Sequence, residues 1–210
     1  RADKEVVLAA VRQDGGALQW AAENMKADKE VVLAAVSQNG VVLQHAAENM
    51  RADKEVVLAA VTNDGWALKF AADDIKADKK VVLVAVANDG DALEFASENL
   101  QNDKELVTVA IKQTGKALKY ASDSMKNDKD IAFMAFRNMG FQVEDHMSLR
   151  DLVLAAVQKD GTVLRAANDE LKKDREVVLA AVQQNGPSIK YAKGGLNQDP
   201  DCLKVSGLWD

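Results

Sequence analysis

Glu144, Asp145 and His146 come closest, in this sequence, to a cluster of catalytic or metal-binding side chains. Carboxylates and an imidazole can transfer protons or bind a metal ion, but a metal site needs three or four ligands that converge on one point. Three neighbours on a helix fan out instead, so a metal or acid–base role is disfavoured here. The sequence has no nucleophile elbow, phosphate loop or paired-histidine motif elsewhere. We therefore expect a protein that is not an enzyme and has no cofactor or metal.

The composition excludes several other classes of protein. One cysteine, Cys202, allows neither an internal disulfide nor a multi-cysteine metal site, which fits a reducing, intracellular compartment. The net charge of −6 disfavours nucleic acid as a partner, because non-specific affinity for it comes mostly from clustered Lys and Arg. The longest apolar runs are of the VVLAAV kind, far short of the roughly 20 residues that span a bilayer. We expect a protein that does not span a membrane.

The elements that position these side chains follow from an internal repeat. The stretch ADKEVVLAAV occurs at 2–11, 27–36 and 52–61. An Asp recurs every 25 residues and a Gly follows it by twelve, in the pairs Asp3 and Gly15, Asp28 and Gly40, Asp53 and Gly65, Asp78 and Gly90, Asp103 and Gly115, and Asp128 and Gly140. A fixed period of about 20 to 50 residues indicates a solenoid, whose repeats must stack to bury their apolar faces.

The period also predicts the domain organisation. Residues 1–198 hold eight tandem repeats, of which the seventh starts four residues early at Arg150 and the eighth resumes the pattern at Asp174. The sixth repeat, 128–148, is irregular and shortened. Residues 199–210 are a partial ninth repeat or a C-terminal cap. The predicted fold is all-α, a solenoid of 25-residue antiparallel αα-hairpin repeats that forms a curved superhelical array.

Within a repeat the pattern predicts two helices, as the second repeat shows. Asp28 is a good N-cap, because its carboxylate can accept from the unpaired N–H groups of the first turn. The apolar run 31–36 covers most of the first helix and predicts that this helix is buried. Gly40 is expected to end it, because glycine takes the left-handed conformation without a Cβ penalty. A second helix is expected over about 41–51.

The repeats resemble a family of short helical repeats catalogued as domain of unknown function 4116, with the pattern DKEVVLAAVxxNGxALxxAxxxLxx. Residues 103–127 and 174–198 carry the resemblance, which extends over nearly the whole chain. The resemblance implies a tandem helical array and an interaction module rather than a catalyst. The family pattern supplies no functional residue to transfer to this sequence.

Recognition is expected where the repeats differ, because the repeat-constant positions build the stack. Two columns contain the candidate partner-binding residues. The after-glycine column, one residue beyond each Gly, contributes Trp66, Asp91, Lys116 and Phe141. The ring column, five residues beyond each Gly, contributes Trp20, His45, Phe70, Phe95 and Tyr120. The first column can hold exposed anchors or fold down over the adjacent turn. The second can be a stacking ladder or, as we favour, a set of wedges between repeats.

Two further columns predict contacts between repeats. A basic residue starts the first helix in all eight repeats, as Lys4, Lys29, Lys54, Lys79, Lys104, Lys129, Arg150 and Arg175. These residues are expected to form an inter-repeat ladder of charge, and a phosphate-binding stripe is disfavoured because acids follow them. An amide column that includes Gln38 and Asn63 is expected to bond terminal carbonyls of its own or the next hairpin, with adenine reading as a distant alternative.

The sixth repeat breaks the rhythm. FQVEDHMSL replaces its second helix, so about one helical turn is missing. Its first helix reads IAFMAF, and we expect Phe133, Met134 and Phe136 to fill the space that the lost turn leaves. The array is expected to bend or change its twist at this point.

Two functional hypotheses follow. The favoured one is a non-catalytic protein–protein interaction scaffold, or a structural subunit of a larger assembly, whose partners are one or more proteins. The alternative is a protein that binds a ligand or single-stranded nucleic acid along the ring column.

Overall fold

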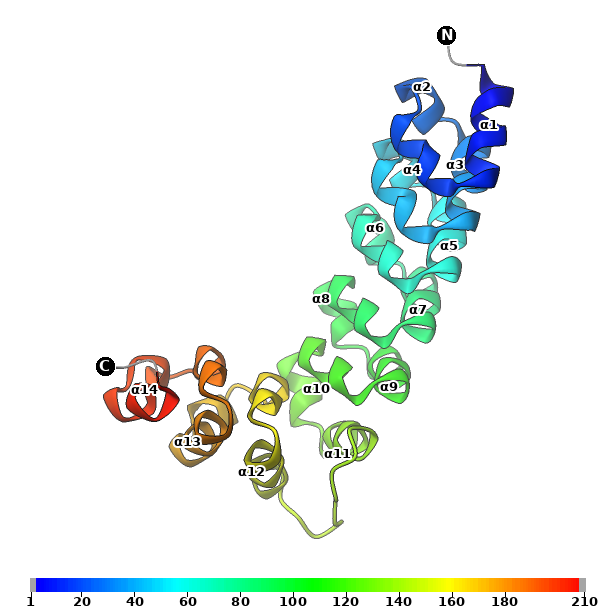
Figure 1. Cartoon of the computed structure of the whole chain (residues 1–210). Coiled ribbons are helices and arrows are strands. Elements are labelled where there is room, and N and C mark those ends of the chain that lie inside the picture. Colours follow the sequence, from blue (N-terminus) through cyan, green and yellow to red (C-terminus); the bar gives the residue numbers. More distant parts are fainter. Residues whose placement is uncertain (1–2, 208–210) are drawn as a thin grey trace. The chain divides into compact units, whose positions relative to one another are not determined.

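A computed structural model describes residues 3–207, and the chain forms two compact units, Arg1–Gln113 and Thr114–Asp210 (Figure 1). Every regular element among the described residues is helical, as predicted. None of the helices in this part of the chain is long and apolar enough to cross a membrane. Residues 1–2 and the last three residues of the predicted cap, 208–210, lie outside the described part.

Each regular repeat contains three helical segments. The first helices are α1 (Lys4–Gln13), α3 (Lys29–Gln38), α5 (Lys54–Asn63), α7 (Lys79–Asn88), α9 (Lys104–Gln113), α11 (Lys129–Asn138), α12 (Leu149–Lys159), α13 (Arg175–Gln184) and α14 (Pro200–Ser206). The 3-10 segments that follow them are η1 (Gly15–Trp20), η2 (Gly40–His45), η3 (Gly65–Phe70), η4 (Gly90–Phe95), η5 (Gly115–Tyr120), η6 (Gly161–Ala166) and η8 (Gly186–Tyr191). The short third segments are α2 (Glu23–Lys26), α4 (Glu48–Arg51), α6 (Asp73–Lys76), α8 (Glu98–Gln101), α10 (Asp123–Asn127), η7 (Leu171–Lys173) and η9 (Leu196–Gln198).

The predicted continuous second helix over 41–51 is wrong. Ala46 and Ala47, which separate η2 from α4, are extended, with ψ angles of 151° and 158°. The N–H of Ala47 donates to the carbonyl oxygen of Lys26 in the first repeat at 2.9 Å. This contact with the preceding repeat replaces the hydrogen bond that would have continued a helix within the same repeat.

The N-caps are confirmed. The predicted left-handed glycine after the first helix occurs at Gly140, which follows the end of α11, but not at Gly40. Asp28 Oδ1 accepts the N–H groups of the first turn of α3, as expected. Gly40, however, opens η2 without a left-handed conformation; among the described glycines, positive φ occurs at Gly140, Gly194, Gly195 and Gly207. Close packing requires glycine instead, because a Cβ on Gly65 would lie 2.5 Å from the carbonyl oxygen of Ala85 in the next repeat.

The core of the first unit lies between successive first helices. Helices α1, α3, α5, α7 and α9 contact one another in sequence order, with α2, α4, α6 and α8 along the other side (Figure 1). Val31, Val32, Ala35 and Val36 of α3 are fully buried, as are the equivalent side chains of α5 and α7. Burial of each valine contributes about 1.5 to 3 kcal/mol relative to leaving it in water. The predicted burial of the first helix is confirmed.

In the second unit, α11, α12, α13 and α14 contact one another in order. The sixth repeat has the first helix α11 but forms no helix over 139–148, which confirms the predicted loss of the second helix. Phe133 and Phe136 of α11 are buried, and the Phe136 ring centroid lies 5.8 Å from that of Phe141 in the loop. The ninth repeat contributes α14, which Asp199 caps.

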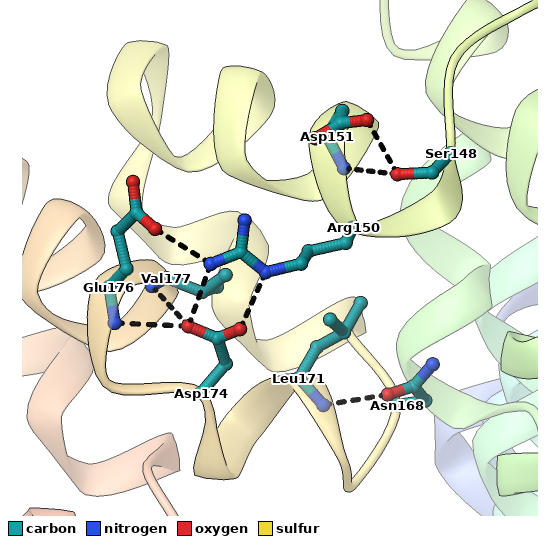
Figure 2. Close-up of polar contacts among 8 residues, drawn as sticks. All are labelled: Ser148, Arg150, Asp151, Asn168, Leu171, Asp174, Glu176 and Val177. Atoms are coloured by element: carbon teal, nitrogen blue, oxygen red, sulfur yellow. Dashed lines mark hydrogen bonds and ion pairs between the residues drawn. The ribbon is translucent and has the colours of Figure 1, made fainter.

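The shortened sixth repeat brings the fifth and seventh repeats into direct contact. Asn168 Nδ2 donates to Asn127 Oδ1 at 2.7 Å, and the Asp169 N–H donates to Asp123 Oδ1 at 2.9 Å. Asn168 is buried, and its Oδ1 accepts the Leu171 N–H at 2.8 Å (Figure 2). Side chains of α10 thus provide polar contacts across the position that the missing segments would have occupied.

Candidate partner-binding surface

A ladder of ion pairs joins neighbouring repeats, as predicted. Lys129 departs from the prediction, because its Nζ donates to the Asp145 carbonyl oxygen in the loop of its own repeat at 3.0 Å. Lys29 Nζ lies 2.8 Å from Asp53 Oδ2 and 2.8 Å from Glu55 Oε2 of the next repeat. The same contact recurs in the pairs Lys4–Asp28, Lys54–Asp78, Lys79–Asp103 and Arg150–Asp174. The other oxygen of Asp53, Oδ1, accepts the N–H groups of Glu55 and Val56. One carboxylate therefore caps its own helix and binds the preceding repeat.

Arg150 makes this contact in the second unit with two donor atoms (Figure 2). Its Nε donates to Asp174 Oδ2 and its Nη2 donates to Glu176 Oε2, both at 2.7 Å. Asp174 Oδ1 also accepts the N–H groups of Glu176 and Val177, which caps α13. A guanidinium can satisfy two carboxylates at once. The seventh repeat therefore keeps the ladder in spite of its early start.

The ladder lowers the pKa of its aspartates. The pKa of Asp53 lies below its ordinary value, first because Lys29 donates to the carboxylate and then because backbone N–H groups do. The same causes lower the pKa of Asp28, Asp78, Asp103 and Asp174. A carboxyl with a depressed folded-state pKa stabilises the fold above its unfolded pKa, and this stability is lost as pH falls through the folded pKa.

We expect the chain to lose stability below about pH 4, near the unperturbed pKa of an aspartate. Urea unfolding followed by circular dichroism, at constant ionic strength and at several pH values between about 7 and 2, measures this. The midpoint should stay level down to about pH 5 and fall steadily below pH 4. The variant Asp53→Asn should show a smaller fall, because it lacks one of the titrating groups. An unchanged midpoint at pH 2 would contradict the expectation.

The amide column also joins neighbouring repeats. Asn63 Nδ2 donates to the Ser37 carbonyl oxygen at 3.1 Å, and Asn63 Oδ1 accepts the Gly40 N–H at 2.8 Å. Asn88 makes the equivalent contact with the Thr62 carbonyl oxygen. The predicted bonding of terminal carbonyls is confirmed, but the carbonyls belong to the preceding repeat and not, as we expected, to the same or the next one. Both ends of the Asn63 amide are used in this contact, which argues against base reading at this position.

The candidate partner-binding residues differ in exposure. Trp20 is 83% exposed, Trp66 is 39% exposed, and Lys116 is exposed. The others are half-buried, namely His45, Phe70, Asp91, Phe95, Tyr120 and Phe141. The most exposed aromatic ring therefore lies in the first repeat, and the rings of later repeats are partly covered.

The structure brings Trp66 and Phe95 together. Their ring centroids lie 5.0 Å apart with an interplanar angle of 68°, an edge-to-face pair. The contact links the after-glycine column of the third repeat to the ring column of the fourth, so Phe95 acts as a wedge between repeats. Such a pair stabilises by about 0.5 to 1.5 kcal/mol beyond its area burial. Phe141 instead lies against Phe136, which corresponds to the folded-down arrangement.

Cations lie beside the rings of the second unit, an arrangement that the sequence did not predict. Lys119 Nζ lies 4.4 Å from the centroid of the Tyr120 ring, and the Arg165 guanidinium carbon lies 5.4 Å from it. Arg165 also lies 6.0 Å from the centroid of Tyr191, with Lys190 at 5.0 Å. These distances allow cation–π attraction. The sequence did contain a signal for these contacts, because the residue before the ring column is Lys or Arg in η5, η6 and η8.

Glu144, Asp145 and His146 do not converge on one point. Asp145 Oδ1 pairs with Arg137 Nη2 at 2.8 Å, and His146 Nε2 lies 3.4 Å from Glu144 Oε2. All three side chains are exposed on the loop of the sixth repeat. Within residues 3–207, no group of three His, Cys, Asp or Glu side chains is placed to hold a metal ion.

Lys172 is a buried lysine, 8% exposed, and burial lowers its pKa to about 8. The nearest carboxylate oxygen is that of Asp169, at 3.9 Å. Gln101 holds the equivalent position in the fourth repeat, where its amide donates to three carbonyl oxygens of its own repeat. This equivalence points to a structural role for Lys172 rather than that of a catalytic amine.

The repeated segments, shared caps and ion-pair ladder define a helical tandem-repeat protein. The chain belongs to the family described as a domain of unknown function (DUF4116), whose profile matches residues 3–51, 53–101, 78–126, 103–143 and 150–194. The predicted resemblance is confirmed, and the gap before the last match falls in the loop of the sixth repeat. No curated protein and no solved structure matches the chain.

Proposed function

We propose that this protein is a non-catalytic scaffold that binds one or more partner proteins, or a structural subunit of a larger assembly. The observation that carries the proposal is the division between constant and variable positions. Val31 and Val36 are fully buried and have equivalents in most repeats, whereas the exposed after-glycine position changes from Trp66 to Lys116 to Thr162. A surface that changes from repeat to repeat over a constant core suits recognition of an extended partner.

The proposal includes a solenoid arrangement of antiparallel hairpins within each unit. Three kinds of inter-repeat contact support it. First helices touch in sequence order, the Lys29 to Asp53 ladder joins successive caps, and the Asn63 amide bonds the preceding repeat. Stacked repeats present long surfaces rather than enclosed pockets, which favours binding of proteins over chemistry on small substrates.

The polar side chains that a catalyst would need are used in packing. The lowered pKa of Asp53 is explained by Lys29, and that of Lys172 by burial. The edge contact between Trp66 and Phe95 supports packing rather than base stacking at that pair.

We further propose an intracellular location, which the single buried thiol of Cys202 supports.

Affinity capture with the tagged full chain, followed by titration calorimetry with each purified candidate, tests the scaffold. We expect at least one protein to bind directly. Trp66→Ala or Lys116→Ala should weaken binding by about tenfold, equivalent to about 1.4 kcal/mol, because these exposed side chains lie on the variable column. Lys80→Ala, an exposed change on α7, serves as the control. Absence of any binding protein, combined with turnover of a substrate by the purified chain, would exclude the scaffold.

A further inference from the structure

The second unit contains a gap in the contacts between the two variable columns. In the first unit Trp66 of one repeat meets the Phe95 ring of the next. Lys116 occupies the after-glycine position of the fifth repeat, and the 25-residue period places Asp145 at the ring position that should follow it. Asp145 lies in the non-helical loop of the sixth repeat and its side chain is 93% exposed. The ring that would pack beside Lys116 is therefore missing.

A pocket of about 160 Å³ lies between η5 and η6, next to this gap. Its apolar lining includes Val163, Ala166 and Tyr191. Ala166 occupies the ring column of the seventh repeat, where Tyr120 and Phe95 stand in earlier repeats, so a small side chain leaves the space open. An apolar cavity of about 150 Å³ can hold a benzene molecule. The pocket therefore has room for one large apolar or aromatic side chain.

The rim of this pocket is positively charged, in contrast to the chain as a whole. Lys116, Lys119 and Arg165 line it, together with one acid, Asp160. Asp160 Oδ1 already accepts hydrogen bonds from the N–H and Oγ1 of Thr162, at 2.9 and 2.6 Å. The segments η5, η6 and η8 carry four basic residues and no acid, whereas the chain has a net charge of −6. This surface therefore attracts negative charge locally.

We propose that this pocket binds an acidic peptide segment of a partner protein, with one large apolar side chain inserted between η5 and η6. The inference rests on the proposed scaffold function and locates one binding site on it. Acidic residues on either side of the inserted side chain would pair with Lys116 and Lys119 at the rim. A single nucleic-acid strand fits this pocket less well. The pocket has room for one ring and not for a row of stacked bases, and the carboxylate of Asp160 at its edge would repel phosphates. The net negative charge of the chain also disfavours a polyanion.

Two substitutions test separately the positive charge of the pocket rim and the space inside the pocket. Lys116→Glu reverses one rim charge, with Lys69→Glu as the matched control, because Lys69 is an exposed lysine on η3 of the first unit. Ala166→Phe leaves every charge in place and fills the pocket with a ring like those of other repeats. If Ala166→Phe unfolds the second unit, Thr162→Tyr fills the same pocket from an exposed position where the third repeat carries Trp66.

Random 12-residue peptides displayed on phage are selected against the full chain, and enriched peptides are tested by fluorescence anisotropy. We expect sequences with one large apolar residue flanked by Asp or Glu. Their Kd should rise by at least about tenfold in Lys116→Glu and in the filled-pocket variants, and by less than about twofold in Lys69→Glu. Replacing the large apolar residue of the peptide by Ser should weaken binding by a similar factor.

The site is excluded if no peptides are enriched, if the enriched peptides lack acidic or large apolar residues, or if the folded filled-pocket variants bind them equally. It is also excluded if a single-stranded oligothymidylate binds as tightly as the peptides, and equally to Ala166→Phe, because charge attraction alone would then explain the binding. The scaffold and the site can fail separately. A captured partner that binds Ala166→Phe as well as wild type leaves the scaffold intact and removes only the site.

Discussion

Gly65→Ala should lower the free energy of unfolding by about 3 kcal/mol, although alanine is the better helix former. A Cβ at this position would lie 2.5 Å from the Ala85 carbonyl oxygen and 3.1 Å from the Asp89 backbone nitrogen. Both are backbone atoms of the next repeat's first helix or its cap, so no side-chain rotation relieves the clash. The third and fourth repeats must move apart, and the buried contacts between α5 and α7 weaken.

Gly16→Ala is the matched control for this prediction. Its Cβ would meet the carboxylate of Asp14, which is the end of a flexible side chain. Later repeats carry Val41 or Trp66 at the equivalent position, so a side chain is tolerated there. Urea unfolding followed by circular dichroism should show little change for Gly16→Ala and a large loss for Gly65→Ala. Equal stabilities of the two variants would show that the repeats do not depend on this close approach.

Phe136→Ala should cost about 4 kcal/mol in the second unit, because Phe136 is 1% exposed and is among the largest fully buried side chains of the described residues. It lies on α11, in the repeat that lacks its second and third segments, so few neighbouring atoms can move in to fill the cavity. Hydrogen exchange of amides in α11 and α12 measures the loss locally, which is preferable because repeat arrays need not unfold in one step.

Phe141→Ala serves as the comparison for Phe136→Ala. Phe141 is half-buried and its ring lies 5.8 Å from that of Phe136, so its removal should cost only about 1 to 2 kcal/mol. A smaller effect of Phe136→Ala than of Phe141→Ala would contradict the interpretation that the phenylalanines of α11 fill the space beside the missing segments.

The features predicted correctly depend on residues close in sequence or on the period itself. Asp28 caps α3 because its acceptor and the donors are within three residues. The ladder follows from the period, because Lys29 must meet the next cap if successive first helices align. The lost second helix of the sixth repeat was visible as a four-residue shift and a loop-like sequence between Asn138 and Arg150.

Other features depend on atoms of a neighbouring repeat and could not be predicted from the residues next to them in the sequence. Alanines at 46 and 47 favour a helix, yet the Lys26 carbonyl of the preceding repeat takes the N–H of Ala47 and breaks it. The role of Gly65 likewise appears only when the Ala85 carbonyl is in place. Exposure of the candidate residues was equally hidden, since Phe95 is half-buried by a contact with Trp66 of another repeat.

The shared carboxylates of Asp28, Asp53, Asp78, Asp103 and Asp174 couple the fraying of a helix end to the separation of two repeats. When the first turn at Asp53 frays, the carboxylate loses its fixed position and Lys29 of the preceding repeat loses one of its two carboxylate partners. Conversely, a repeat that detaches leaves the next cap without its cation. Unfolding should therefore start at one end of the array and proceed from each repeat to its neighbour. The repeats nearest that end should exchange their amide hydrogens first.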